Sequence, residues 1–281
     1  MSSPTGSTGY APDPSLAERL RPNAVAQFIA LSKRSLAGSV RQLPLLLPSL
    51  IFPMFFVAIN VSSFNKSLPL LRANGYPKLT SFLTFTLAAT VVQGVLFGCV
   101  QGATDLATDI ELGFFERLIA APASRGAILV SRLAGSVIVG IVQGAIFTGI
   151  LMIFGARIAG GVPAFLVLLV SSGLLALAFG GLLAAMALKT GSAEAVQSSF
   201  PVVFILLFAS SAFFPRQTMQ GLFKKFAGIN PISHVVEGLR ELIINGWSSS
   251  AALKAVLIPA LMAVCTFALA VRSLQKRLAA S

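Results

Sequence analysis

The stretch LAGSVIVGIVQGAIFTGILMIF, residues 133–154, decides the fold, because it is predominantly apolar and carries no charged side chain. In a bilayer every backbone N–H and C=O group must find a partner within the protein, so a run of this kind forms a helix of about 20 residues that crosses the hydrocarbon core. Further apolar runs occupy residues 43–61, 82–103, 164–187, 197–214 and 255–271. The sequence therefore predicts an all-α membrane protein with six transmembrane helices.

The composition of the whole chain agrees with a membrane environment. Of its 281 residues, 56% are hydrophobic and only 11% are charged, whereas an ordinary soluble domain carries about 25% charged residues. The net charge of +12 does not indicate a nucleic-acid partner, because the Lys and Arg residues stand singly or in pairs beside the apolar runs, where they anchor spans against lipid headgroups. Cys99 and Cys265 lie inside apolar runs and are expected to be small buried side chains.

The residues before the first apolar run divide into two parts. Residues 1–22 are rich in Ser, Gly and Pro, and we expect a disordered cytoplasmic tail. Residues 23–42 fit an amphipathic helix lying in the membrane interface, although an ordinary polar lead-in to the first span is the alternative. Six spans place both termini on one side, and the distribution of Lys and Arg favours the cytoplasm for that side. Residues 43–277 then form one six-span domain in the cell membrane.

The span cores lack the groups that would supply energy or catalysis. None of the nine acidic residues falls within a span core, whereas a proton-driven transporter needs an ionisable group there. The chain also contains no P-loop, no HExxH and no GxSxG pattern. His234, Glu237 and Glu241 stand at helical spacing and could ligate a metal, but a solvated helix face explains them more simply. We therefore expect no catalytic residue and no metal or cofactor bound by this chain.

The segment between the second and third apolar runs has an unusual character for a connection. Its stretch ELGFFERL, residues 111–118, combines acidic and aromatic side chains and is followed by Pro122 and Arg125. A short helix here would expose more apolar surface than an idle loop. Such a helix indicates a protein partner or the membrane surface as its contact.

This segment resembles the cytoplasmic loop of type 2 ATP-binding-cassette (ABC) permeases, the membrane subunits of drug, lipid and polysaccharide exporters, including those of the daunorubicin-resistance type. In that family the pattern E-x-G-x-x-E-R-L, then a small residue, Pro and a basic residue, leads into the third span. A second segment, residues 213–240, contains Asn230-Pro231 and looks like the family's outer re-entrant helical hairpin. The family commonly has a basic residue near the acidic start of the loop, which residues 109–112 lack.

The resemblance implies how the chain would be driven. Residues 109–121 would form a coupling helix seated in a groove of a separate ABC ATP-binding subunit, present in two copies and holding ATP and Mg²⁺. A second permease copy would complete a homodimer or a paralogous heterodimer. The implied function is outward movement of a drug, lipid or lipid-linked compound by alternating access, with a non-transporting scaffold or a passive channel as the alternative. The candidate coupling residues are Asp109, Glu111, Phe114, Phe115, Glu116, Arg117, Pro122 and Arg125.

Two further sets of residues are singled out within the spans. Small residues recur every fourth position, a pattern that lets helices approach closely in lipid, within one subunit or between two; these are Gly94, Gly98 and Gly102, and then Gly140 and Gly144. In the resembled family the second and fifth spans line the central cavity, which makes their aromatic side chains candidates for a substrate path. The alternative is that these rings only pack the helices against lipid. The corresponding candidates for a substrate path are Phe82, Phe85, Gln93, Phe200, Phe204 and Phe208.

Overall fold

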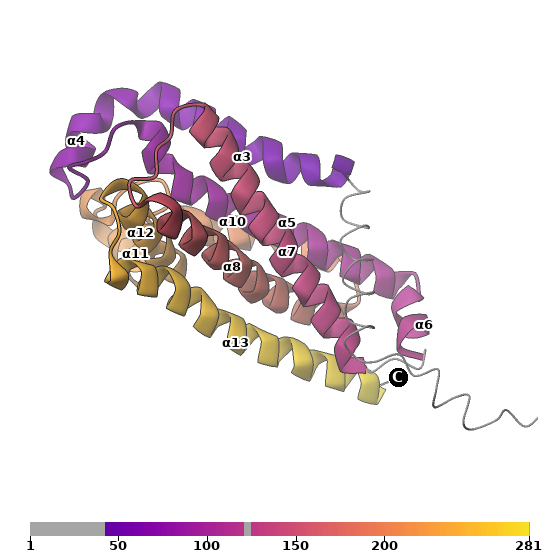
Figure 1. Cartoon of the computed structure of the whole chain (residues 1–281). Coiled ribbons are helices and arrows are strands. Elements are labelled where there is room, and N and C mark those ends of the chain that lie inside the picture. Colours follow the sequence, from indigo (N-terminus) through magenta and orange to yellow (C-terminus); the bar gives the residue numbers. More distant parts are fainter. Residues whose placement is uncertain (1–42, 121–124, 281) are drawn as a thin grey trace, which may run out of the picture.

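The computed structural model describes residues 43–120 and 125–280, and the regular structure in these ranges is helical (Figure 1). Within them, four helices are long and apolar enough to cross a membrane: α5 (Phe82–Glu111), α7 (Arg125–Ile153), α8 (Gly161–Thr190) and α13 (Ser249–Ala280). Helix α3 (Leu43–Phe64) is apolar as well and packs on α5. The predicted tail 1–22 and the predicted interfacial helix 23–42 lie outside the described residues.

Helix α8 lies at the centre of the bundle and packs against α13, α5 and α7. Glycines let the neighbouring backbones come close, as at Gly181, where an added Cβ would lie 3.1 Å from Thr266 Oγ1 of α13. Without a hydrophobic driving force between helices in lipid, such close packing is what holds spans together. The core of the protein therefore runs along α8 and α5, and α5 is the most buried of the four long helices.

Short helices gather at the two ends of the bundle (Figure 1). At one end, called here the α6 end, lie α6 (Phe114–Ala120) and α9 (Ala193–Gln197), next to the last turns of α5, α8 and α13. At the other end, called the α12 end, lie η1 (Asn65–Ser67), α4 (Leu68–Ala73), η2 (Arg216–Thr218), α11 (Gly221–Ile229) and α12 (Pro231–Ile244). Asn230 caps α12, because its side-chain oxygen accepts the Ile232 N–H at 2.9 Å, and Pro231 suits the first helical position.

The predicted fifth span, residues 197–214, differs from the structure. The region forms α9 and then α10 (Phe200–Phe208), and residues 209–215 are not helical. Groups of α12 explain where α10 ends. Ser211 donates its backbone N–H to Ser233 Oγ at 3.0 Å and its hydroxyl to the Ser233 carbonyl at 3.2 Å. Because these contacts satisfy buried polar groups of the segment, it does not need a further helical turn.

The predicted coupling helix, residues 109–121, also begins later than expected. Helix α5 continues to Glu111, the chain turns at Gly113 with φ +67°, and α6 starts at Phe114. Glycine suits this turn because a positive φ strains other residues. Asp109 and Glu111 therefore belong to the last turn of α5. The four long helices are also longer than the apolar runs predicted for them, because hydropathy marks only the part of a helix that matches the hydrocarbon core.

Candidate functional site

The acidic residues of the α6 end contact groups of the chain itself. Asp109, in the last turn of α5, forms an ion pair with Arg132 of α7. Glu111 Oε1 accepts the backbone N–H of Ala193, the first residue of α9, at 2.8 Å. That N–H belongs to the first turn of a helix and has no intrahelical partner. The end of α5 is thus tied to α7 through one carboxylate and to α9 through the other.

Glu116 of α6 makes the third such contact. Arg277 of α13 donates from Nη2 to Glu116 Oε1 at 2.9 Å and from Nη1 to the Leu188 carbonyl of α8 at 3.2 Å. The hydrogen bond from Arg277 lowers the pKa of the Glu116 carboxyl, because it stabilises the ionised form. One arginine therefore joins α6, α8 and α13.

The remaining candidate coupling residues divide between the inside and the surface. Phe115 is 3% exposed and packs in the main core, whereas Phe114 and the preceding Leu112 are 36% and 74% exposed. Arg117 is also exposed. Pro122 lies outside the described residues, and Arg125 opens α7. The contacts of these residues with an ATP-binding subunit stay a prediction, for which α6 offers an apolar surface beside a cation.

Phenylalanines from three helices pack into a continuous group, called here the aromatic wall. The rings of Phe204 and Phe208 lie 4.3 Å apart, and those of Phe208 and Phe213 lie 4.5 Å apart, measured between centroids. Phe204 of α10 stacks on Phe97 of α5, and Phe200 meets the same ring at a tilt. Phe52 and Phe56 of α3 contact Phe204 and Phe208 edge-on. The aromatic wall consists of Phe52, Phe56, Phe97, Phe200, Phe204, Phe208 and Phe213.

The other three candidates for a substrate path belong to α5 and are not members of this wall. Phe82 is 3% exposed at the start of α5, and Phe85 is fully buried one turn later. Gln93 is 1% exposed, and its Nε2 has no hydrogen-bond partner among the described residues. The role of the six candidates as a path stays a prediction.

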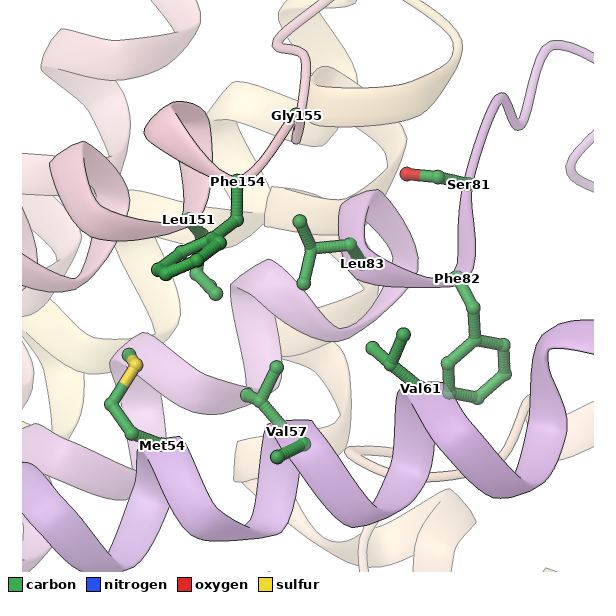
Figure 2. A pocket seen from close by; sticks show the side chains of 10 residues that line it. Met54, Val57, Val61, Ser81, Phe82, Leu83, Leu151, Phe154 and Gly155 are labelled. Atoms are coloured by element: carbon green, nitrogen blue, oxygen red, sulfur yellow. The ribbon is translucent and has the colours of Figure 1, made fainter.

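Phe82 instead belongs to a cavity of about 560 Å³ near the α12 end, between α3, the start of α5 and the end of α7 (Figure 2). The lining is almost entirely apolar: Met54, Val57, Ala58, Val61, Ser81, Phe82, Leu83, Leu151, Phe154 and Gly155. Its one hydroxyl, on Ser81, lies 3.0 Å from Thr84 Oγ1 and caps α5 by accepting the Thr84 N–H. A cavity of this size and polarity suits a small apolar ligand, whose usual pockets measure about 300–1,000 Å³.

Arg240 of α12 is fully buried, which the sequence reasoning missed. It donates from Nε to the Phe85 carbonyl at 3.3 Å, from Nη1 to the Ser211 carbonyl at 3.0 Å and from Nη2 to the Ala212 carbonyl at 2.5 Å. It thereby ties α12 to α5 and to the segment that follows α10. One signal was present in the sequence. Arg240 falls on the apolar stripe of α12 at helical spacing from Ile232, Val236 and Ile243.

Four of the five candidate packing glycines lie at close helix contacts within the single chain. An added Cβ would collide with the Phe147 ring at Gly94 and would lie 2.6 Å from Gln143 Oε1 at Gly98, both across the α5–α7 contact. Gly140 and Gly144 meet α8 in the same way, at the residues Ser172 and Ala176. Gly102 faces open space.

Comparison with known proteins gives a consistent result. The family model described as ABC-2 type transporter matches residues 26–244. The chain is 34% identical to the daunorubicin resistance ABC transporter permease protein DrrB1 of Streptomyces coeruleorubidus over 169 residues, which are 58% of each chain, so the match spans less than two thirds of that relative. It is 22% identical to the probable doxorubicin resistance ABC transporter permease protein DrrC of Mycobacterium tuberculosis over 223 residues, which are 79% of this chain and 78% of the relative.

Proposed function

Since this chain belongs to the ABC-2 type transporter family, we propose that it is the membrane permease subunit of an ATP-driven exporter. The chain has no P-loop, so ATP and Mg²⁺ are held by two copies of a separate ABC ATP-binding subunit. A second permease copy, identical or paralogous, completes the transporter. Its substrate is a hydrophobic or amphipathic molecule such as a drug, a lipid or a lipid-linked compound, moved outward by alternating access.

In this proposal the α6 end faces the cytoplasm, together with both termini. The last turns of α8 and α13 carry Lys189, Arg272, Lys276 and Arg277, and Arg132 lies in the first part of α7. Over the whole sequence, 12 Lys and Arg residues precede the first span or fall at this end, against 9 at the other end, and an excess of basic residues favours the cytoplasmic side. Six spans follow if α3 and the pair α9–α10 cross the membrane along with the four long helices. Helices α11 and α12 then form a re-entrant hairpin on the outer side.

The observation that carries the proposal is the placement of α6. This seven-residue helix connects two long apolar helices, α5 and α7, at the α6 end of the bundle. A helix of this length is not stable alone in water, and it stays in place through Phe115 in the core and Glu116 on Arg277. Phe114, at its start, and Leu112, in the turn before it, nevertheless have exposed side chains. Exposed apolar side chains at a helix that is anchored to the bundle indicate a binding site for a partner protein, whose movement the helix would transmit to the spans.

The apolar interior of the protein supports the proposed substrate class. Neither the aromatic wall nor the cavity near Phe82 includes an ionised side chain among its residues. Large aromatic surfaces bind the apolar bodies of drugs and lipids with little demand on their polar groups. The resistance to daunorubicin and doxorubicin in the names of the relatives supports a drug within this class.

The test is co-expression of the permease with an ABC ATP-binding subunit, followed by affinity purification and transport assays in vesicles. Phe114→Asp places a charge on the exposed surface of α6 and should abolish both association and ATP-dependent transport. Leu70→Asp, an equally drastic change on the exposed α4 at the other end, is the matched control and should leave association intact. If no ATP-binding subunit associates with the unaltered chain and flux needs no ATP, the protein is a passive channel or a scaffold and the proposal is wrong.

A further inference from the structure

Arg277, in the last turns of α13, reaches two other helices at once. Its two terminal nitrogens contact Glu116 Oε1 of α6 at 2.9 Å and the Leu188 carbonyl of α8 at 3.2 Å. Figure 1 shows α6 and the end of α13 at the same end of the bundle. Helix α13 also packs along α8 more extensively than any other pair of helices in the described chain. The side chain of Arg277 therefore sits where three helices meet.

The end of α8 is shaped to receive a cation. Leu188 is one of the last residues of α8, whose final carbonyls lack intrahelical partners and carry a partial negative charge. Gly191 follows in the left-handed conformation with φ +63°, and a Cβ there would lie 3.2 Å from Arg277 Nη1. Glycine at this position thus ends the helix and leaves room for the guanidinium group.

The planar guanidinium group explains why this position holds Arg. It presents its N–H donors in a fixed fork, so the carboxylate of Glu116 and the carbonyl of Leu188 bind to one rigid group. A displacement of α6 then moves α13 and the end of α8 with it or breaks the contact. A lysine would offer a single ammonium group on a flexible stem and could not span both acceptors with the same geometry.

We infer that Arg277 is a positioning residue that transmits movement of α6 to α8 and α13, and that Glu116 serves this internal contact and not the docking of a partner. The inference rests on the proposed function, because the movement of α6 comes from the ATP-binding subunit. Docking then falls to the exposed side chains of Leu112 and Phe114 at the start of α6. Glu116 would be the point at which the force passes into the membrane helices.

The experiment uses the full permease with its ATP-binding subunit in proteoliposomes and measures three quantities: binding of the subunit, ATP hydrolysis, and substrate transported per ATP hydrolysed. Glu116→Gln and Arg277→Gln should each leave subunit binding unchanged and lower transport per ATP roughly five-fold. The double variant should be no worse than either single variant, because both remove the same contact. Arg277→Lys should recover only part of the loss. Lys276→Gln removes a neighbouring exposed charge on the same helix and should have no effect.

Three results would overturn the inference. Weaker subunit binding in Glu116→Gln but not in Arg277→Gln would show that Glu116 docks the partner. Additive losses in the double variant would show that the two residues act separately. An unaltered ratio of transport to hydrolysis in both single variants would show that the contact transmits nothing. Failure of the proposed function has a different signature, since the unaltered permease would then show no ATP-dependent transport at all.

Discussion

The guanidinium carbon of Arg240 lies 3.9 Å from the centre of the Phe85 ring, in the interior of the protein. The ring of Tyr76 lies on the same cation at 5.9 Å, and three backbone carbonyls accept its N–H groups. A buried charge is tolerated only when it is hydrogen-bonded, and a desolvated contact of a cation with an aromatic face contributes about 2 kcal/mol. Arg240 therefore joins α12, α5 and the end of α10 without a carboxylate among these contacts.

Replacing Arg240 should destabilise the protein strongly. Arg240→Met keeps much of the side-chain volume but leaves the carbonyls of Ser211 and Ala212 without their donor, at a cost of about 1–3 kcal/mol for each buried group. We expect a clear fall in the thermal unfolding temperature of the purified protein in detergent. Arg216→Met is the matched control, because the ion pair of Arg216 with Glu237 is partly exposed and should contribute less than about 1 kcal/mol. Equal unfolding temperatures for the two variants would contradict the role given to Arg240.

The contact between Glu116 and Arg277 should depend on pH in one direction. Because the folded protein lowers the pKa of Glu116, the contact stabilises the fold fully above the ordinary glutamate pKa of about 4.3. Its contribution is lost as the pH falls through the lowered value. A spin label at Arg117 should therefore stay immobile from neutral pH to about pH 5 and become mobile in more acidic buffer. The effect should be small and should shrink in high salt, because Glu116 is largely exposed.

In the Glu116→Gln variant the same label should be mobile already at neutral pH and should not respond to acid. A label that responds identically in both proteins would show that another group controls α6.

Gly94 should tolerate no side chain, in contrast to Gly102. An alanine at Gly94 drives its methyl group into the Phe147 ring, whereas the same methyl group at Gly102 meets open space. We expect Gly94→Ala to lower stability by about 1–3 kcal/mol and Gly102→Ala to have little effect, as measured by thermal unfolding. A smaller side chain in Phe147→Leu should partly rescue Gly94→Ala. If the rescue fails, the contact between α5 and α7 at this level is not the cause of the loss.

Phe204 tests whether the aromatic wall contributes to the substrate path. Its ring lies against Phe208 and Phe97, and it is only half-buried. Phe204→Ala should change the rate or the substrate preference of transport, while membrane insertion and binding of the ATP-binding subunit stay as in the unaltered protein. Val202→Ala, an exposed residue on the same helix, is the control and should behave like the unaltered protein. Unchanged transport in Phe204→Ala would remove this residue from the path.

The sequence by itself determined the parts of the fold that depend on local composition. Residues 133–154 and the other long apolar runs form helices because the hydrocarbon core offers their backbones no other hydrogen-bond partner. The start of α12 at Asn230-Pro231 follows from residues that suit those backbone positions. These features require information from only a few neighbouring residues.

The tertiary structure alone decided which distant residues meet. Helix α10 ends at Phe208, and Ser233 and Arg240 of α12 form hydrogen bonds with the backbone of Ser211 in the segment that follows. Glu116, predicted as a contact for a partner, accepts a hydrogen bond from Arg277, 161 residues further along the chain. Hydropathy and spacing cannot reveal such pairs. A charged side chain can bind water, a partner protein or a distant helix, and the sequence pattern is the same in all three cases. Only the packing of α8 against α13 brings Arg277 to the end of α6.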